Sequence, residues 1–467
     1  MKNPYGISDF GRIRDGGFFY ADKTPFLAVL EAGYQHVVFL RPRRFGKSTL
    51  VSMLEHYYDL GRKDAFDRRF AGLWVHAHPT EERSRYLVLT LDFSSVATDR
   101  GPDALLRTLV ESVRNRVRTF LLRYRRLVPE LDDLYERLDD VQDAEGLVGM
   151  VLDVVAATPH QIYLLVDEYD HFANRLLSGG AEDMYEAIVT KTGFVRTFYA
   201  TLKAGTTSGA VARMFVTGVS PLMLDDLSSG FNIATHASLD VGLNTLAGLT
   251  RPDVTRAVDE LLTARPELAE SPGIDDRGAL LDLLEACYDG YRFSEDAPER
   301  VFNSDMVLHF LRELAARKRL PRSMLDRNVR TEYGHLQRIG ALSGTAVAER
   351  RMLLQTILGE GRIRSEIVEQ FGVKSLASHA HFLSLLYFLG MLTMGTSPRS
   401  AMGYELEIPN RVIRELQWEY LALMLRDDAG VRIDVDEPQR ALTGRYSWLL
   451  ELRHLEGGCR SAGPEDA

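Results

Sequence analysis

The feature that most constrains the fold is a short apolar segment that runs through a glycine-lysine-serine loop into a helix. Residues 36–40 (HVVFL) are continuously apolar, which predicts a buried strand. Residues 41–48 (RPRRFGKS) follow at once, and from Ser48 onward apolar side chains recur at helical spacing. This order predicts a phosphate-binding loop, because the first turn of a helix presents free N–H groups.

The loop departs from the general pattern at its first position. The pattern asks for Gly, four residues, Gly, Lys and Ser or Thr, and here Arg41 replaces the first glycine. Gly46 lets the backbone approach phosphates, Lys47 would pair with the β- and γ-phosphates, and Ser48 would ligate Mg²⁺. For the two arginines before Phe45, solvated charge or an acidic partner is the alternative. The residues predicted to bind the nucleotide are Arg43, Arg44, Phe45, Gly46, Lys47, Ser48 and Thr49.

An acidic pair follows another apolar strand. Residues 162–166 (IYLLV) run directly into Asp167 and Glu168, which is the Walker B arrangement. We predict that Asp167 holds Mg²⁺, directly or through water, and that Glu168 orients and deprotonates the attacking water. Solvated acids at a strand end are the alternative, as is a chance turn at the Gly-Lys-Ser loop. Together in one sheet, the two motifs predict a site for ATP and Mg²⁺.

Strands and helices alternate through the first half of the chain. Further strands are predicted at 86–91 and 211–216, and the helices between strands at 103–127, 145–157 and 184–203. This alternation predicts an α/β fold, a P-loop NTPase parallel sheet with helices on both faces. Thr217 follows the strand at 211–216 and is predicted to sense the γ-phosphate, with a turn-forming Thr-Gly pair as the alternative.

After about residue 240 helices replace the alternation. Thr250 and Asp253 predict a capped helix start, which opens a helical lid. Two later helical stretches precede a predicted hairpin formed by 390–394 and 404–408, which suggests a winged-helix-like unit. The predicted domains are an AAA-like P-loop ATPase domain at 1–240, a lid at 241–335, a winged-helix-like domain at 336–428 and a short tail at 429–467.

Composition restricts the class of protein. The 467 residues are enough for two or three domains, and 45% hydrophobic with 26% charged residues is typical of globular proteins. No apolar stretch is long enough to span a bilayer, and the N-terminus lacks the apolar region of a signal peptide. Cys287 and Cys459 stand far apart, which fits a reducing cytoplasm.

Charge gives a mixed indication about nucleic acid. The net charge of -10 argues against a globally basic nucleic-acid binder. Arginines nevertheless make the predicted helix at 103–127 locally basic. A DNA-facing surface, a solvated helix face and a contact between copies of the chain are the alternatives for that helix.

Motifs in order over about 5–425 resemble one family. They include 7–10 (ISDF), 19–24 (FYADKT), 41–48, 91–94 (LDFS), 166–170 (VDEYD), 215–220 (FVTGVS), 288–293 (YDGYRF) and 406–410 (LEIPN). The set resembles the bacterial AAA-ATPase-like family, whose members usually carry a PD-(D/E)xK nuclease-like C-terminus. That family commonly has the Arg-Pro-Arg-Arg-Phe-Gly-Lys loop, so the resemblance accounts for Arg41.

The resemblance also implies roles for other residues. It places Lys47 and Ser48 in the loop and Asp167 and Glu168 in the acidic motif, as the residues themselves do. In the lid it makes Arg292 a candidate sensor of the phosphates, with a structural turn as the alternative. It marks 22–24 (DKT) as an element near the nucleotide, without assigning its chemistry.

The C-terminal tail departs from the family. Glu451 stands where the nuclease motif has its glutamate, and Asp434 or Asp436 could supply the upstream aspartate. Arg453 stands in place of the lysine, and arginine cannot act as a base because it stays protonated. Little chain follows the winged-helix-like unit, so we expect a nuclease remnant without activity.

The sequence as a whole predicts a cytoplasmic P-loop ATPase. It would bind ATP and hydrolyse it with Mg²⁺, act as a nucleotide-driven switch, and serve a nucleic-acid-related process. The expected partners are ATP, DNA through the winged-helix-like domain and further copies of the chain, and no membrane. An ATPase-linked PD-(D/E)xK-type nuclease and a non-hydrolysing scaffold are the alternative functions.

Overall fold

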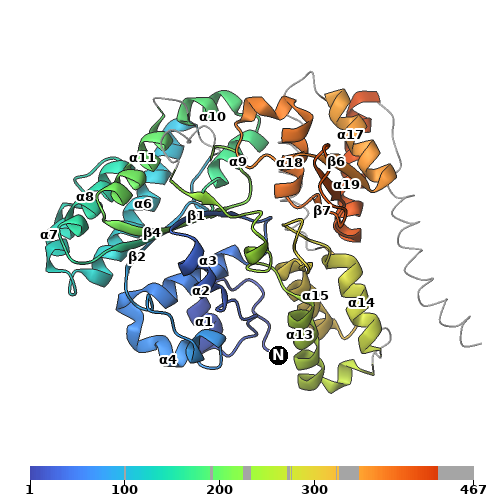
Figure 1. The fold of residues 1–467 in the computed structure, drawn as a ribbon, viewed down its shortest axis with the longest axis horizontal. Helices are drawn as coiled ribbons and strands as arrows, with labels where there is room; N and C mark the ends of the chain where they lie inside the picture. Colours follow the sequence, from blue (N-terminus) through green and yellow to red (C-terminus); the bar gives the residue numbers. More distant parts are fainter. Residues whose placement is uncertain are drawn as a thin grey trace, which may run out of the picture.

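The first half of the chain folds as an α/β unit around one sheet (Figure 1). The computed structural model describes residues 1–98, 101–189, 193–224, 233–270, 274, 276–321, 323–325 and 347–429. The sheet has five strands in the order β2-β3-β4-β1-β5, and all its strand pairs are parallel. The strands are β1 (His36–Leu40), β2 (Leu87–Asp92), β3 (Ile162–Asp167), β4 (Val211–Gly218) and β5 (Thr235–His236). The predicted parallel sheet is therefore confirmed.

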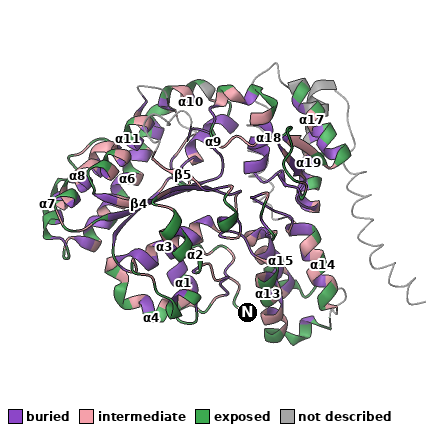
Figure 2. Ribbon diagram, viewed as in Figure 1, coloured by how far each residue is buried: buried purple, intermediate pink, exposed green. Residues whose placement is uncertain are grey.

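Helices cover both faces of the sheet. Figure 1 shows α3 on one face, and α6, α8 and α11 on the other. The helices of this half are α1 (Phe10–Asp15), α2 (Phe26–Gly33), α3 (Lys47–Tyr58), α4 (Phe66–Arg69), α5 (Trp74–Ala77), α6 (Pro102–Tyr124), α7 (Asp132–Arg137), α8 (Ala144–Ala156), α9 (His171–Ser178), α10 (Glu182–Val189) and α11 (Phe194–Thr207). This arrangement buries every residue of β3. Figure 2 shows β4 of the same sheet largely in purple, the colour of buried residues.

One helix prediction in this half is wrong. The predicted helix at 184–203 is two helices, because α10 ends at Val189 and α11 begins at Phe194. Gly193 is the N-cap of α11 in an extended conformation, and a Cβ atom there would lie 2.1 Å from the carbonyl oxygen of Ile188. The extended conformation at Gly193 interrupts the helix, and the close approach to Ile188 leaves room only for glycine there.

The predicted lid region is helical. It contains α13 (Arg251–Ala264), α14 (Arg277–Tyr288) and α15 (Ser304–Arg317). The capping box predicted at Thr250 and Asp253 is present, since each side chain accepts from the other residue's backbone N–H. Asn303 caps α15 by accepting a hydrogen bond from the backbone of Met306.

The C-terminal part combines helices with a small sheet. Its elements are α17 (Val347–Glu360), β6 (Arg362–Ser365), α18 (His379–Phe388), β7 (Thr393–Met394), β8 (Tyr404–Glu407) and α19 (Arg411–Ala429). The sheet is antiparallel in the order β6-β8-β7, which confirms the predicted hairpin. Residues 382–388 of α18 are all buried, and the Tyr387 hydroxyl donates to the Phe293 carbonyl 3.0 Å away. α18 therefore packs against the lid. The tail from 430 onward, with the nuclease-like residues, lies outside the described residues.

Candidate functional site

A cavity of about 370 Å³ opens where β1 ends and α3 begins. Its wall combines four parts of the chain that are far apart in sequence. They are the N-terminal segment up to Lys23, the loop and first turn of α3 at 44–50, residues 246–249, and the start of α15, with Glu168 added from the end of β3. Parallel strand ends meet at one edge of a sheet, which is where ligands collect in α/β folds.

The loop adopts a conformation that only glycine adopts freely at its turn. Gly46 has φ +86° and is the N-cap of α3, so the helix starts directly at Lys47. The Lys47 ammonium is buried and donates to the carbonyls of Arg41 at 3.0 Å and Pro42 at 3.1 Å. Burial lowers the pKa of Lys47, while the charge of Glu168 opposes this shift. A phosphate group would offer the ammonium a partner in place of these two carbonyls.

Arg41 turns its side chain away from the cavity. Its guanidinium lies between the rings of Phe39 and Phe293, 4.2 Å and 4.1 Å from their centres. The same group donates to the carbonyl oxygens of Ser238 at 2.7 Å and Leu243 at 3.0 Å. A glycine at this position would therefore leave the cavity unchanged and remove a link to the lid.

The predicted metal ligands lie together. The pKa of Asp167 is raised to about 6 by burial and by the charge of Glu168, and a hydrogen bond from Ser48 opposes this shift. Hydroxyl and carboxylate oxygens suit Mg²⁺, which binds one or two protein ligands and completes its shell with phosphate oxygens and water. Within the described part of the chain, no group of three or more His, Cys, Asp or Glu residues forms a separate metal site.

Glu168 is held at the cavity wall in a fixed position. Its φ of 55° lies in the left-handed region, which is uncommon for a residue other than glycine. Its Oε2 is 3.4 Å from Nδ1 of His171. Burial would raise the pKa of Glu168, but the hydrogen bond with His171 and the positive charge of Lys47 lower it to about 2. Glu168 is therefore ionised at neutral pH, as a proton acceptor must be.

Two predicted sensors are not brought to this cavity. Thr217 is buried beside Phe39 in the sheet, and its hydroxyl donates to the Phe39 carbonyl at 2.9 Å. The backbone N–H of Arg292 donates to Thr393 Oγ1 at 2.7 Å. Burial lowers the pKa of the Arg292 guanidinium, and the positive charge of Arg300 lowers it further. The described residues of the cavity wall include neither Thr217 nor Arg292.

Other lid residues, which the motif analysis did not single out as functional, reach the loop instead. Asn303 donates through Nδ2 to the Arg43 carbonyl at 3.3 Å. The backbone N–H of Asp305 donates to the Arg44 carbonyl at 3.1 Å, and its carboxylate pairs with the Arg44 guanidinium. The sequence did indicate a helix start at this point, because asparagine is a residue type that caps helices.

Asp170 has a structural role that the sequence left open. It precedes α9, but its side chain does not cap that helix. Its carboxylate accepts from the backbone N–H groups of Val219 and Ser220 and from the Asn174 amide. Asp170 thus ties the end of β3 to the end of β4.

Most arginines of the locally basic helix α6 are neutralised inside the molecule. Arg116 pairs with Asp92 at 3.0 Å, and Arg123 pairs with Asp59 at 2.8 Å. The others with acidic or carbonyl partners are Arg114 and Arg118, and Arg125, directly after the helix, pairs with Asp132. This pairing favours a structural role for the helix over a DNA-facing surface.

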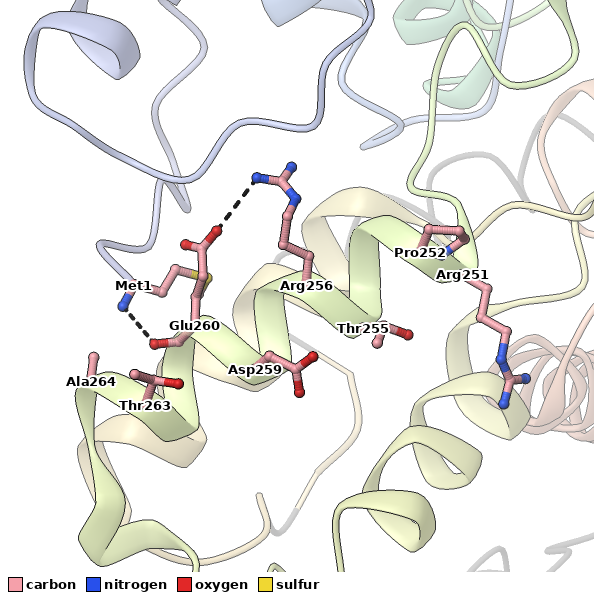
Figure 3. Close-up of a pocket in the computed structure, with 9 residues that line it drawn as sticks. All are labelled: Met1, Arg251, Pro252, Thr255, Arg256, Asp259, Glu260, Thr263 and Ala264. Atoms are coloured by element: carbon pink, nitrogen blue, oxygen red, sulfur yellow. Dashed lines mark hydrogen bonds and ion pairs between the residues drawn. The ribbon is translucent and has the colours of Figure 1, made fainter. Parts of the chain in front are cut away.

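A second hollow, of about 850 Å³, runs along one face of α13 (Figure 3). In Figure 3 its charged side chains spread along the helix, and Arg256 pairs with Glu260 at 3.4 Å. One helix face without converging polar groups is a poor ligand site. The smaller cavity at the loop is therefore the candidate functional site.

The loop, the acidic pair and the parallel sheet define a nucleotide-binding P-loop protein of the α/β class. Residues 4–228 match the family model described as "Predicted AAA-ATPase". A curated relative, "Uncharacterized protein in vnfD 5'region" of Azotobacter chroococcum mcd 1, is 29% identical over 318 residues. The match covers 66% of this chain and 52% of the relative, so the chain spans about half of that protein's length.

Two solved structures from Aeropyrum pernix resemble the chain weakly. One is the ORC2 protein in ADPNP and ADP complexes, with 12% identity, a TM-score of 0.29, and coverage of 88% of this chain and 98% of the other. The second is the ORC1 protein in complex with DNA, with 13% identity, a TM-score of 0.23, and coverage of 78% and 92%. These superpositions are too loose to assign a fold or a function.

In the ranges that the structure describes, no helix is both long enough and apolar enough to cross a bilayer.

Proposed function

We propose that this protein binds ATP with Mg²⁺ and hydrolyses it. The observation that carries the proposal is one cavity wall that contains Lys47, Ser48 and Glu168, with Asp167 adjacent to Ser48. Backbone N–H groups at the start of α3 and the Lys47 ammonium would bind the β- and γ-phosphates. Ser48 and Asp167 would hold Mg²⁺, which when bound neutralises charge on the phosphate oxygens.

Glu168 is the proposed general base. Its carboxylate lies at the cavity wall and is ionised at neutral pH, so it can accept a proton from a water molecule beside the γ-phosphate. His171 would keep the carboxylate oriented toward that water. Thr217 and Arg292 would act on this step only after a rearrangement that brings them to the cavity.

A switch function is supported by the contacts of the loop. Gly248 donates to the Phe45 carbonyl at 2.9 Å, and the Phe45 ring packs edge-on against Tyr291. A Cβ atom on Gly390, in the C-terminal part, would lie 2.8 Å from Pro42. We propose that the ATPase domain at 1–240 transmits its nucleotide state through these contacts to the lid at 241–335 and the winged-helix-like domain at 336–428.

The proposed link to nucleic acid rests on the order of elements in the C-terminal part. Helix, strand, helix and hairpin follow one another there, as in winged-helix domains. A helix that reads DNA needs an exposed polar face, and residues 382–388 of α18 are buried. DNA binding through α18 would therefore require its release from the lid, which makes this output dependent on the switch.

The test combines binding with turnover. Titration calorimetry should detect Mg-ATP binding to the unaltered chain, and Lys47→Ala should lose most of the affinity. Phosphate release should occur in the unaltered chain and be absent from Lys47→Ala. ATP binding without phosphate release would favour the non-hydrolysing scaffold, and equal binding by both chains would overturn the proposed site. DNA added to the same assay tests the nucleic-acid link through a change in turnover.

A further inference from the structure

The cavity at the loop has two chemically different ends. At the sheet edge it carries the charged and polar groups proposed to hold phosphates and Mg²⁺. The remaining wall is mostly apolar and includes Ile7, Phe19, Tyr20, Leu246, Leu249 and Leu308. An apolar slot beside a phosphate site is suited to a planar base, because small-ligand sites combine apolar walls with a few directed polar groups.

Lys23 is a charged residue on the N-terminal part of this wall. It belongs to the Asp22-Lys23-Thr24 motif, whose chemistry the sequence did not assign. Its side chain is only 12% exposed, and its ammonium donates to the Thr245 carbonyl at 2.8 Å. It also faces the Asp253 carboxylate at 3.7 Å. The two neighbours of Lys23 are also held in place, since Asp22 accepts from the backbone N–H of Trp74 and the Thr24 hydroxyl accepts from that of Val75.

Lys23 and Lys47 serve separate parts of the cavity. The acidic groups that act on Lys23 are Asp253, Asp22 and Glu299, whereas those that act on Lys47 are Glu168, Asp167 and Asp170. An ammonium has three N–H donors. The Thr245 carbonyl accepts from one of them at 2.8 Å, and the Asp253 carboxylate, 3.7 Å away, engages a second. One donor therefore remains on a side chain that lines the cavity wall.

We propose that Lys23 recognises the nucleobase, by donating a hydrogen bond from its ammonium to a ring-nitrogen acceptor of the purine. This inference rests on the proposed function, because it assumes that the triphosphate occupies the loop. The inference gives the Asp22-Lys23-Thr24 motif a role in base specificity. The loop would bind the phosphates of any nucleotide, and Lys23 would select a base whose ring nitrogen faces its ammonium.

The test removes one acceptor at a time from the ligand. The unaltered full chain is titrated with Mg-ATP and with the 1-deaza, 3-deaza and 7-deaza analogues, each of which lacks one ring nitrogen. We expect one analogue to bind roughly 10- to 100-fold more weakly, the effect of losing a hydrogen bond from a charged donor in a buried site. Equal affinities for ATP and all three analogues would overturn the proposal without any substitution in the protein.

A variant then assigns the effect to Lys23. Lys23→Met keeps the length of the side chain and removes its donors, so the sensitive analogue and ATP should bind the variant equally. The compared quantity is the ratio of the affinities for ATP and for the analogue, measured on the same variant. A partial loss of stability lowers both affinities alike and leaves this ratio unchanged. Lys63→Met, a change at an exposed lysine in the 3-10 helix at 60–65, should keep the full discrimination.

Inorganic tripolyphosphate separates this inference from the proposed function. Lys23→Met should leave its affinity unchanged, and Lys47→Ala should abolish its binding. Lack of binding of both ATP and tripolyphosphate to the unaltered chain would contradict the proposed function itself. Discrimination that persists in Lys23→Met would contradict only the role of Lys23.

Discussion

The guanidinium of Arg41 lies 4.1 Å from the centre of the Phe293 ring, so the first residue of the phosphate loop is joined directly to the lid. The general loop pattern has a glycine here, which could make no such contact. Arg41 therefore connects the loop to Phe293 and Leu243, which follow the sheet in the sequence.

Arg41→Ala should destabilise the protein. It removes hydrogen bonds to the Ser238 and Leu243 carbonyls and leaves a cavity between two rings, with an expected cost of about 2–4 kcal/mol. Thermal unfolding measures the change. Arg107→Ala, at an exposed position of α6, should have almost no effect. Equal melting temperatures for the two variants would contradict the connecting role of Arg41.

Glu168→Gln should separate binding from turnover. Glutamine keeps the size and much of the hydrogen bonding but accepts no proton, so Mg-ATP should still bind while phosphate release falls by roughly 10²–10⁴-fold. Asp167→Asn should instead weaken Mg²⁺ binding, so turnover should need a higher Mg²⁺ concentration. Glu81→Gln, at an exposed site, is the control for a change of charge. Full turnover in Glu168→Gln would mean that another group accepts the proton.

Gly290→Ala should disrupt the junction between the lid and the C-terminal part. A Cβ atom at Gly290 would lie 1.9 Å from the Pro409 carbonyl oxygen, at a φ of +100°. Gly209 is the matched control, because its φ is +82° and a Cβ atom there meets nothing within 4 Å. Both variants should lose about 1–2 kcal/mol from backbone strain, and Gly290→Ala should lose several kcal/mol more. Similar thermal unfolding of both would show that the junction tolerates a side chain.

His56 should make stability depend on pH. Arg62 and Arg69 can only donate hydrogen bonds, and both face ring nitrogens of His56, so at least one of these nitrogens must accept and the ring is neutral. Burial, followed by the charges of these arginines, lowers the pKa of His56 to about 2 in the folded protein. In the unfolded chain the ring binds a proton below about pH 6.5.

The sign of the effect follows from proton binding. Below about pH 6.5 the unfolded state binds the additional proton, so stability falls as the pH falls, by at most about 1.4 kcal/mol per pH unit from this residue. Denaturation of the unaltered chain and of His56→Gln should be compared from pH 7 to pH 4. The stability advantage of the unaltered chain should shrink with acidification, and parallel curves would contradict the assignment.

Local sequence patterns were sufficient to predict the parallel sheet and the helix that follows the Gly-Lys-Ser loop. Strand periodicity located β1 and β3, and because parallel strands end at one edge, Lys47 and Glu168 were expected to meet there. The break between α10 and α11 was missed because Gly193 excludes a continuous helix only through a contact with Ile188.

The rest of the site depends on contacts between distant residues. Nothing in the local pattern around Thr217 indicates that the Phe39 carbonyl binds its hydroxyl. In the same way, the spacing around Lys23 does not show that residues 245 and 253 fold against it. The first pairing is set when β1 and β4 align in the sheet, and the second when residues 245 and 253 pack against the N-terminal segment. Periodicity carries no information about either.

The wall of the candidate cavity joins N-terminal residues to residues synthesised much later. The amide of Asn3 donates to the Leu308 carbonyl at 2.8 Å, across 305 residues of sequence. At a synthesis rate of about 5–20 residues per second, roughly 15–60 s separate the synthesis of Asn3 from that of Leu308. During that time Ile7 and Phe19 lack their apolar neighbours from the lid. A ribosome-bound fragment that ends before α15 should therefore present an open cavity wall to chaperones, and nucleotide binding should appear only late in biosynthesis.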